Sequence, residues 1–309
     1  AYFFNIDSGD VNDTSFEPIN DTEGFAGREM LDASVRLSLD LDVGELVLTS
    51  AYSKTDDDFY QDIDFAPIPF LDASQTVEVE GFSQEIRLTS SSEGRLRWQI
   101  GGYYAEIDQD VTTLLIDSVG MLSGVAGLNI PFGINENKNT TFAVFSQVNY
   151  DLTEQLELTA ALRYDEDERE QFSLTEMVDR EKTFRELQPK FSAAYRWNEQ
   201  LMTYLTISRG FRSGAFNGTD YITRGYDAET LWNYEVGAKG DFLNSRARVN
   251  VAAFYMDYTD RQEYVIRPLS GAQALFNVPE SEVLGVDIEG VILLSENLEI
   301  SFGIGLLDS

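Results

Sequence analysis

Cysteine and histidine are both absent from the 309 residues of this chain. Without cysteine, the chain can form neither a disulfide framework nor a thiolate site for a metal ion. Without histidine, it can build neither Ser-His-Asp nor Cys-His catalytic machinery, and no imidazole-ligated zinc. These absences weigh against an enzyme, and the sequence predicts no catalytic residue, no metal site and no cofactor.

Basic residues are scarce, because 22 lysines and arginines stand against 54 aspartates and glutamates and give a formal net charge of −32. Such a surface repels phosphates, which excludes nucleic acid as a partner. Strong acidity is also typical of disordered chains, but 43% hydrophobic and 12% aromatic residues indicate a folded one. Long apolar runs are missing too. The longest uncharged run, Ser118–Asn135, is broken by glycine and proline and is shorter than the roughly 20 apolar residues of a spanning helix.

Alternation of apolar and polar residues is what the chain has instead. Every second residue from Leu156 to Tyr164 is apolar, and most residues between them are polar. A period of two indicates a β-strand whose two faces meet different surroundings. The pattern recurs and predicts roughly twelve strands joined as hairpins, each about 9–12 residues long against about 5–6 in soluble sheets. Pro189 cannot donate to a ladder, so we expect a bulge or the effective start of a strand there.

The apolar face of these strands ends in aromatic residues, such as Tyr52, Trp98, Tyr150 and Trp232, whereas the other face carries charge. A soluble sandwich would bury the apolar face against a second sheet. A transmembrane barrel places it against lipid, with an aromatic girdle at each interface and a wet lumen behind. Core packing explains any single strand, but lipid contact fits all the strands together. We therefore predict an all-β fold, an antiparallel transmembrane β-barrel in the bacterial outer membrane, with the soluble sandwich as the alternative.

Short turns and long connecting segments alternate along the chain. Outer-membrane barrels have short periplasmic turns and long extracellular loops, so the asymmetry predicts that 1–309 is part of a single barrel domain, with a loop over 1–30 and strands over 31–309. Acidic stretches in the long segments could bind hard cations such as calcium. No spacing matches a known ion-binding loop, however, which favours a solvated surface. The long extracellular loops are expected near 56–81, 108–139, 165–182, 213–229 and 260–280.

One motif carries a resemblance to a known family. Ser208–Gly218 reads Ser-Arg-Gly-Phe-Arg-Ser-Gly-Ala-Phe-Asn-Gly, and it resembles the stretch with which a strand of the TonB-dependent outer-membrane receptors opens an extracellular loop. It departs from that stretch by Ala215, where the family usually has a second glycine. The resemblance covers about residues 31–309 and is specific for the family but not for a substrate. Further segments similar to the family's barrel are Leu162–Asp165, Asn233–Lys239, Ala253–Tyr258 and Gly285–Gly290.

The resemblance implies a plugged barrel of about 22 strands. It also implies energy delivered by an inner-membrane TonB complex through a segment that precedes the plug. No plug-like segment precedes residue 31, and the chain ends at Leu307-Asp308-Ser309 without the aromatic residue that such barrels normally present. About twelve strands cannot close a barrel of that size. We therefore expect a barrel-region fragment of a longer receptor, whose plug and last strands lie outside this sequence.

The function that the resemblance implies is TonB-dependent active uptake of a scarce nutrient across the outer membrane of a Gram-negative bacterium, with a ferric siderophore as the expected substrate. Alternatives are saccharide or cobalamin uptake by the same fold, and a passive porin-like channel. The expected partners are the TonB complex, outer-membrane lipid and lipopolysaccharide, and a small-molecule substrate such as a ferric chelate. Loop aromatics could stack on that substrate or pack the loops on one another. The residues expected to contact substrate or plug are Arg97, Arg163, Lys190, Lys239, Arg248, Arg212, Phe216 and Tyr226.

Overall fold

The computed structural model describes residues 22–64, 70–219, 223–244, 246–266 and 273–309, and every regular element within them is a β-strand. No helix in these ranges is long and apolar enough to cross a membrane. The strands are β1 (Phe25–Leu41), β2 (Gly44–Asp62), β3 (Leu71–Thr89), β4 (Leu96–Asp117), β5 (Leu128–Asp151), β6 (Leu156–Ser173), β7 (Val178–Arg196), β8 (Leu201–Arg212), β9 (Ala215–Phe216), β10 (Gly225–Tyr226), β11 (Glu229–Phe242), β12 (Ala247–Ile266), β13 (Gln273–Ser295) and β14 (Leu298–Asp308).

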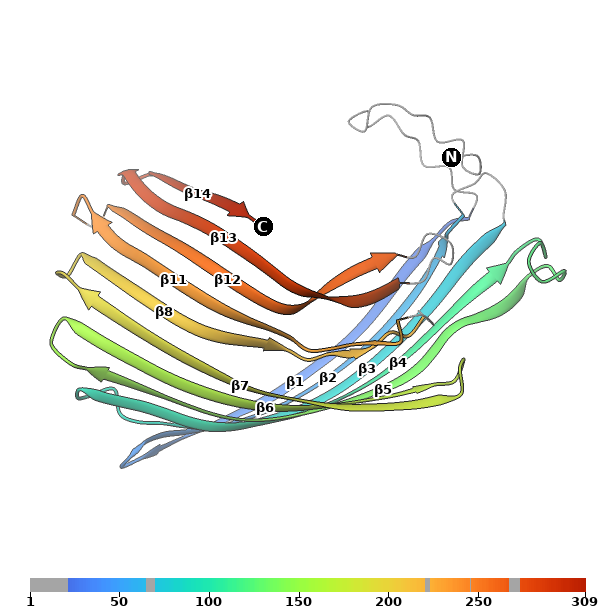
Figure 1. Ribbon diagram of the computed structural model, residues 1–309, viewed down its shortest axis with the longest axis horizontal. Helices are drawn as coiled ribbons and strands as arrows, with labels where there is room; N and C mark the ends of the chain where they lie inside the picture. Colours follow the sequence, from blue (N-terminus) through green and yellow to red (C-terminus); the bar gives the residue numbers. More distant parts are fainter. Residues whose placement is uncertain (1–21, 65–69, 220–222, 245, 267–272) are drawn as a thin grey trace.

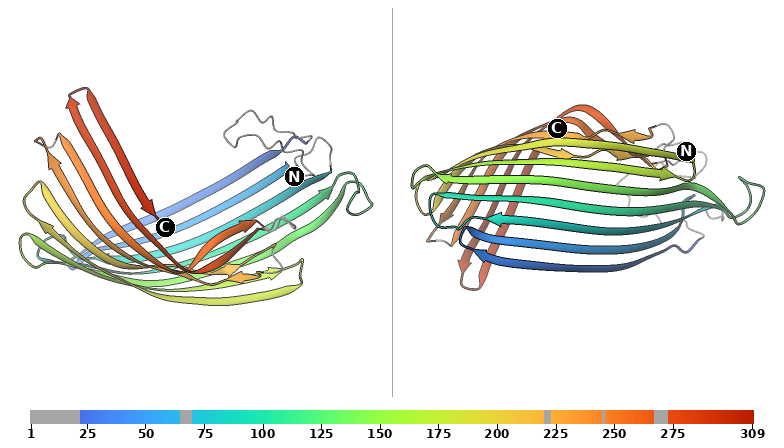
Figure 2. Two further views of the ribbon diagram at one scale, coloured as in Figure 1. Left: turned by 45° about the horizontal axis from the view of Figure 1, so that its top comes forward. Right: turned by 90° about the horizontal axis from the view of Figure 1, so that it is seen from below.

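One 12-stranded antiparallel sheet contains all of these strands except β9 and β10, which pair with each other. Each strand of the large sheet lies beside its neighbour in sequence, with a single step from β8 to β11. Figures 1 and 2 show the sheet as a curved trough, with β1 (blue) along one edge and β14 (red) along the other. Within the described residues the trough stays open, because β1 and β14 each pair on one side only. The predicted all-β, antiparallel fold is confirmed.

The convex, outer face of the trough is apolar. Val35, Ile86 and Ile100 point outward and are 62%, 48% and 54% exposed. In contrast, the buried hydrophobic residues among those described are few and mostly small, namely Val47, Ala105, Ala143, Phe184, Ala247 and Ala274. A soluble protein hides its large apolar side chains, and a continuous exposed apolar surface of this kind marks contact with another apolar phase. The sheet therefore has its apolar layer on the outside and its polar face within the trough.

Most strands of the large sheet are longer than the predicted 9–12 residues, and their lengths run from 11 residues in β14 to 24 in β5. Much of what the pattern assigned to loops is strand, and the segment near 165–182 shrinks to a turn between Ser173 and Val178. The sheet also begins at Phe25, before the predicted start at 31. Beyond an apolar belt both faces of a strand meet water, so alternation disappears from the sequence although the backbone ladder continues. Residues 1–21, 65–69, 220–222 and 267–272 lie outside the described residues.

Pro189 marks a break in the sheet rather than a break in its strand. β7 passes through Pro189, which sits opposite Leu162 of β6. On its other side, however, β7 pairs with β8 only from Lys190↔Ser208 to Arg196↔Met202. Proline has no N–H to donate, which suits the position where this ladder stops. We call the limited pairing the β7–β8 seam. Beyond Lys190 and Ser208, toward the end of the sheet that carries the longer loops, β7 and β8 are not paired through their backbones, and side-chain contacts such as the ion pair of Arg209 with Glu186 connect them instead.

Candidate functional site

Between β8 and β11, the described residues 213–219 and 223–228 lie across the polar face of the trough, and we call them the strap. It includes the small β9–β10 hairpin. On one side it is held by β5 and β6. The guanidinium of Arg169 donates to the Ser213 hydroxyl at 2.5 and 3.2 Å, and Asn135 Nδ2 donates to the Gly218 carbonyl at 3.2 Å. Lys182 of β7 adds an ion pair to Asp227.

On its other side the strap is held by β12 and β13, through side-chain amides that imitate a strand. Asn217 Nδ2 donates to the Leu275 carbonyl at 2.8 Å, and the Leu275 amide donates to Asn217 Oδ1 at 2.9 Å. The reverse arrangement follows nearby, where Asn277 accepts from the Asp227 amide at 2.7 Å and donates to the Asp227 carbonyl at 3.0 Å. Gln262 donates to the carbonyls of Ser213 and Asp227. Each such bond replaces a backbone partner that a ladder would supply.

Gly214 fits the strap because no side chain can. A Cβ there would lie 2.2 Å from the Tyr226 carbonyl oxygen and 2.7 Å from Cζ of Phe184, which is buried beneath the strap. Both distances are far below van der Waals contact, and the nearer atom is backbone. The Ser-Gly and Phe-Asn-Gly parts of the motif are thus explained by packing and hydrogen bonding, since they fix the strap to the trough.

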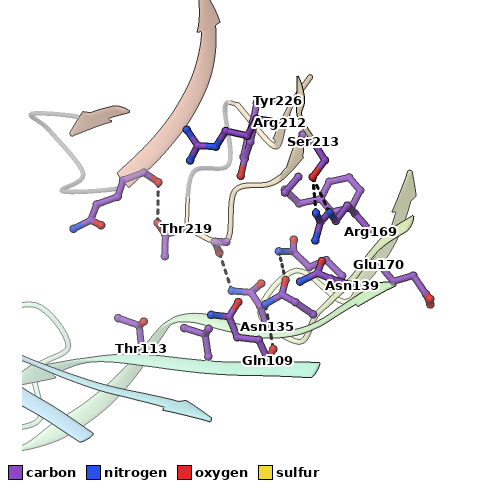
Figure 3. A pocket seen from close by; sticks show the side chains of 18 of the residues that line it. Gln109, Thr113, Asn135, Asn139, Arg169, Glu170, Arg212, Ser213, Thr219 and Tyr226 are labelled. Atoms are coloured by element: carbon purple, nitrogen blue, oxygen red, sulfur yellow. Dashed lines mark hydrogen bonds between the residues drawn. The ribbon is translucent and has the colours of Figure 1, made fainter. Parts of the chain in front are cut away.

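A cavity of about 550 Å³ lies between the strap and the polar face of β3 to β6. This volume is within the range of small-molecule sites, about 300–1,000 Å³. Figure 3 shows Gln109, Thr113 and Asn135 below the strap, with Arg212 and Tyr226 above them. Residues from distant parts of the sequence meet here, because Asn135 and Gly218 are joined by a hydrogen bond across 83 positions.

Carboxamides dominate the lining of this cavity. They are Gln75, Gln109, Asn135, Asn137, Asn139, Gln171 and Gln273. Some of these carboxamides already form hydrogen bonds within the sheet, since Gln171 donates to Asn137 Oδ1 at 2.9 Å and Asn137 donates to the Gln109 backbone carbonyl at 3.2 Å. The side chains of Gln109, Asn139 and Gln273 make no hydrogen bond to the described residues. Their amides retain donors and acceptors for a ligand.

Two arginines give the cavity its positive charge, and a phenol adds a neutral hydrogen-bond donor. Arg169 forms an ion pair with Asp167 at 3.3 Å, whereas Arg212 makes none with the described residues. Burial raises the pKa of the Tyr226 hydroxyl, and the charges of Arg212 and Arg169 only partly oppose that rise. The phenol therefore stays protonated at neutral pH and can donate a hydrogen bond. Glu170 is at the rim, and Figure 3 shows its side chain pointing away.

The predicted contact residues fall into separate groups. Arg212, Phe216 and Tyr226 all line the cavity under the strap. Lys239 and Arg248 line a smaller hollow of about 420 Å³ at the short-turn end of the trough. The other three lie along the polar face: Arg97 bonded to Asp151 and Glu157, Arg163 bonded to Asp165, and Lys190 opposite Ala161 and Ser208. The structure therefore does not bring the eight residues to one site.

The carboxamides are the residues that sequence reasoning missed. Asn135, Asn137 and Asn139 lie in a segment that was assigned to an extracellular loop, although they are spaced by two and share one face of β5. That spacing is the usable signal, because a period of two places side chains together on a strand even where neither face is apolar. The inward fold of the strap has no comparable signal.

An antiparallel sheet with long strands, an apolar convex face and a polar concave face is the wall of a transmembrane β-barrel. The family model described as "TonB dependent receptor-like, beta-barrel" matches residues 2–307, and the chain belongs to that family. The resemblance read from the motif is confirmed.

Solved structures of similar fold include the ferric yersiniabactin uptake receptor FyuA from Yersinia pestis, at 15% identity and a TM-score of 0.74, covering 92% of this chain and 43% of that one. The siderophore receptor PiuA from Acinetobacter baumannii gives 18% identity and a TM-score of 0.73, covering 92% and 47%. The ferric-catecholate import receptor Fiu from K12 E. coli gives 15% and 0.65, covering 94% and 49%. The chain thus spans less than half the length of these structures.

Proposed function

We propose that this chain forms part of the barrel wall of an outer-membrane receptor that takes up a small-molecule nutrient by TonB-dependent active transport. The observation that carries the proposal is the polar cavity beneath the strap, on the concave face of a sheet that belongs to this receptor family. A cavity with several convergent hydrogen-bonding groups is the usual form of a small-molecule site. The role is transport rather than catalysis.

The orientation of the wall follows from its two ends. Short turns lie together at one end, and the longer hairpin ends and the strap at the other (Figure 1). Outer-membrane barrels place their short turns in the periplasm. In the proposed orientation the cavity opens toward the cell exterior, and the apolar outer face contacts lipid and lipopolysaccharide. The TonB complex acts through a plug in the lumen.

A ferric siderophore is the proposed substrate. Support comes from the family and from structural neighbours, among them the ferric yersiniabactin uptake receptor FyuA and the siderophore receptor PiuA. At 15% and 18% identity these two structures show a shared fold, and the substrate is part of our proposal. Saccharide or cobalamin uptake by the same fold is the alternative. A passive, porin-like channel fits less well, because the strap crosses the polar face where such a channel needs open water.

Uptake by the full-length receptor tests the proposal. The gene would be expressed in a Gram-negative strain that lacks its own siderophore receptors, and iron accumulation from ferric chelates would be followed with and without a functional TonB. Accumulation that requires both the receptor and TonB is the expected result. Accumulation that persists in the TonB-deficient strain would indicate a passive channel and overturn the proposal.

A further inference from the structure

We propose that the cavity under the strap accepts a ligand whose bound portion carries at most one negative charge and presents hydroxyl or amide groups, rather than a polyanionic catecholate chelate. This inference rests on the proposed function and narrows its substrate. It draws on two properties of the cavity, the balance of its charges and the kind of polar group that remains available for binding.

Charge sets the first limit. Arg212 is the cation that lines the cavity without an ion pair among the described residues, since Asp167 already faces Arg169. A ferric tris-catecholate carries several negative charges, and one arginine leaves most of them uncompensated. Placing uncompensated like charges in a partly enclosed site is unfavourable.

The available polar groups set the second limit. Gln109, Asn139 and Gln273 line the cavity with carboxamides that are free toward the described residues. A carboxamide both donates and accepts without carrying charge, so it matches hydroxyl and amide groups, which have the same dual capacity. A catecholate oxygen bound to iron only accepts, and each carboxamide oxygen facing it would lose its partner.

The arrangement also predicts how the ligand lies. Arg212 and the protonated Tyr226 belong to the strap side, whereas Gln109 and Asn139 belong to β4 and β5 on the opposite wall (Figure 3). A single anionic group would bind at Arg212 and Tyr226, with charge-assisted hydrogen bonds. The hydroxyl or amide groups would face the carboxamide wall, and Phe216 would cover an apolar patch of the ligand.

Two sources share this chemistry. One is an acidic saccharide, whose carboxylate is its only charge and whose remaining surface is hydroxyl groups. The other is a ferric hydroxamate chelate, in which the iron charge is neutralised by hydroxamates and the exposed surface is amide and hydroxyl groups. The two differ in the role of Arg212, because only the acidic saccharide brings an anion for it to bind.

Binding to the full-length receptor in detergent separates these cases. Calorimetric titrations would use a uronic-acid disaccharide, its neutral counterpart, a ferric trihydroxamate and a ferric tris-catecholate. We expect the disaccharide acid or the trihydroxamate to bind at least roughly tenfold more tightly than the tris-catecholate. Arg212→Gln should weaken the disaccharide acid roughly tenfold and leave uncharged probes unchanged. Arg185→Gln is the matched control, since Arg185 pairs with Glu166 on the outer face and should alter nothing.

Tris-catecholate binding as tight as that of the other probes would overturn the inference, and so would the failure of every hydroxyl- and amide-bearing probe to bind. Equal weakening of charged and uncharged probes by Arg212→Gln would overturn the placing of the anion. These failures differ from that of the proposed function. TonB-dependent uptake of a tris-catecholate would leave the transporter proposal standing, whereas TonB-independent flux of a tightly bound hydroxamate would leave only the cavity inference standing.

Discussion

The two faces of β4, β5 and β6 beyond the apolar belt differ in charge. Gln109, Asn139 and Gln171 line the cavity on the concave face. Their neighbours in sequence, Asp108, Lys138 and Glu170, point outward with further acidic residues, including Asp110, Glu136, Asp179 and Glu181. One step along a strand therefore exchanges a neutral amide for a charge.

At the level of the cavity, this difference places most of the acidic side chains on the outer face. Carboxylates on the outer face are open to water and counter-ions, so their mutual repulsion is screened. The same charges inside a partly enclosed cavity would cost more and would repel an anionic ligand. The net charge of −32 is thus a poor guide to what the cavity binds. The period of two lets one strand serve both environments.

Displacing the strap should have the largest effect, because it would open the concave face to bulk water and remove its contrast with the outer face. Gly214→Ala places a Cβ 2.2 Å from the Tyr226 carbonyl oxygen. We expect destabilisation near the upper end of the about 1–3 kcal/mol typical of overpacked sites. Faster hydrogen exchange in 213–219 and 223–228 would accompany loss of uptake. Gly303→Ala is the control, since nothing lies within 4 Å of its Cβ position. Unchanged exchange in Gly214→Ala would contradict the described packing.

Removing one anchor should have a smaller effect. Asn217→Ala deletes both bonds to the backbone of Leu275. We expect a local loss of about 2 kcal/mol, because the Leu275 amide and carbonyl then lack partners. Faster amide hydrogen exchange at Leu275 and along the strap would measure this loss of stability. Asn149→Ala, which removes a carboxamide near the short turns, should leave the strap unchanged. Equal effects of the two variants would show that the strap does not depend on Asn217.

Exchanging charge between the faces tests the contrast itself. Gln109→Glu puts a carboxylate into the cavity, and Asp108→Asn removes one from the outer face next to it. We expect Gln109→Glu to weaken an anionic ligand roughly tenfold, or about 1.4 kcal/mol, and Asp108→Asn to leave binding unchanged. Titration at low and high salt measures both. Similar effects from the two variants would mean that the overall charge, rather than the lining, decides affinity.

The hairpin tip between β4 and β5 offers the smallest effect and a pH dependence. Burial would raise the pKa of Asp117, but hydrogen bonds from Ser123, Met121 and Leu122 outweigh it and hold that pKa below its usual value. The stabilisation is therefore complete above the ordinary pKa of about 3.9 and is lost as pH falls through the lowered folded value. Exchange at 118–127 should rise only in that acidic range. Asp117→Asn should raise it at neutral pH and abolish the acid dependence.

The strands and their hairpin order were predictable because the alternating pattern is local. The alternation over Leu156–Tyr164 indicates a strand with one apolar face without any knowledge of distant contacts. The strand ends were not predictable, since β4 and β5 continue where both faces are polar. The short turn between β6 and β7 was read as a long loop for the same reason.

The cavity could be predicted only in part. Arg212, Phe216 and Tyr226 were chosen from the motif and the loop aromatics, and they do line it. The opposite wall was out of reach, because pairing Asn135 with Gly218 requires knowing that the strap folds inward. Nothing local in the sequence encodes that fold. Whether these residues contact a substrate stays a prediction.

The β7–β8 seam gives this wall an unequal tolerance of mutation. Elsewhere neighbouring strands are joined by backbone groups, which every residue except proline possesses, so a substitution leaves the join intact. Above the seam the strap is joined to its surroundings largely by the side chains of Ser213, Asn217, Asn277 and Gln262. A single amino-acid substitution can remove such a side-chain hydrogen bond. In random mutagenesis, substitutions in the strap should therefore abolish function more often than polar-to-polar substitutions in the surrounding strands.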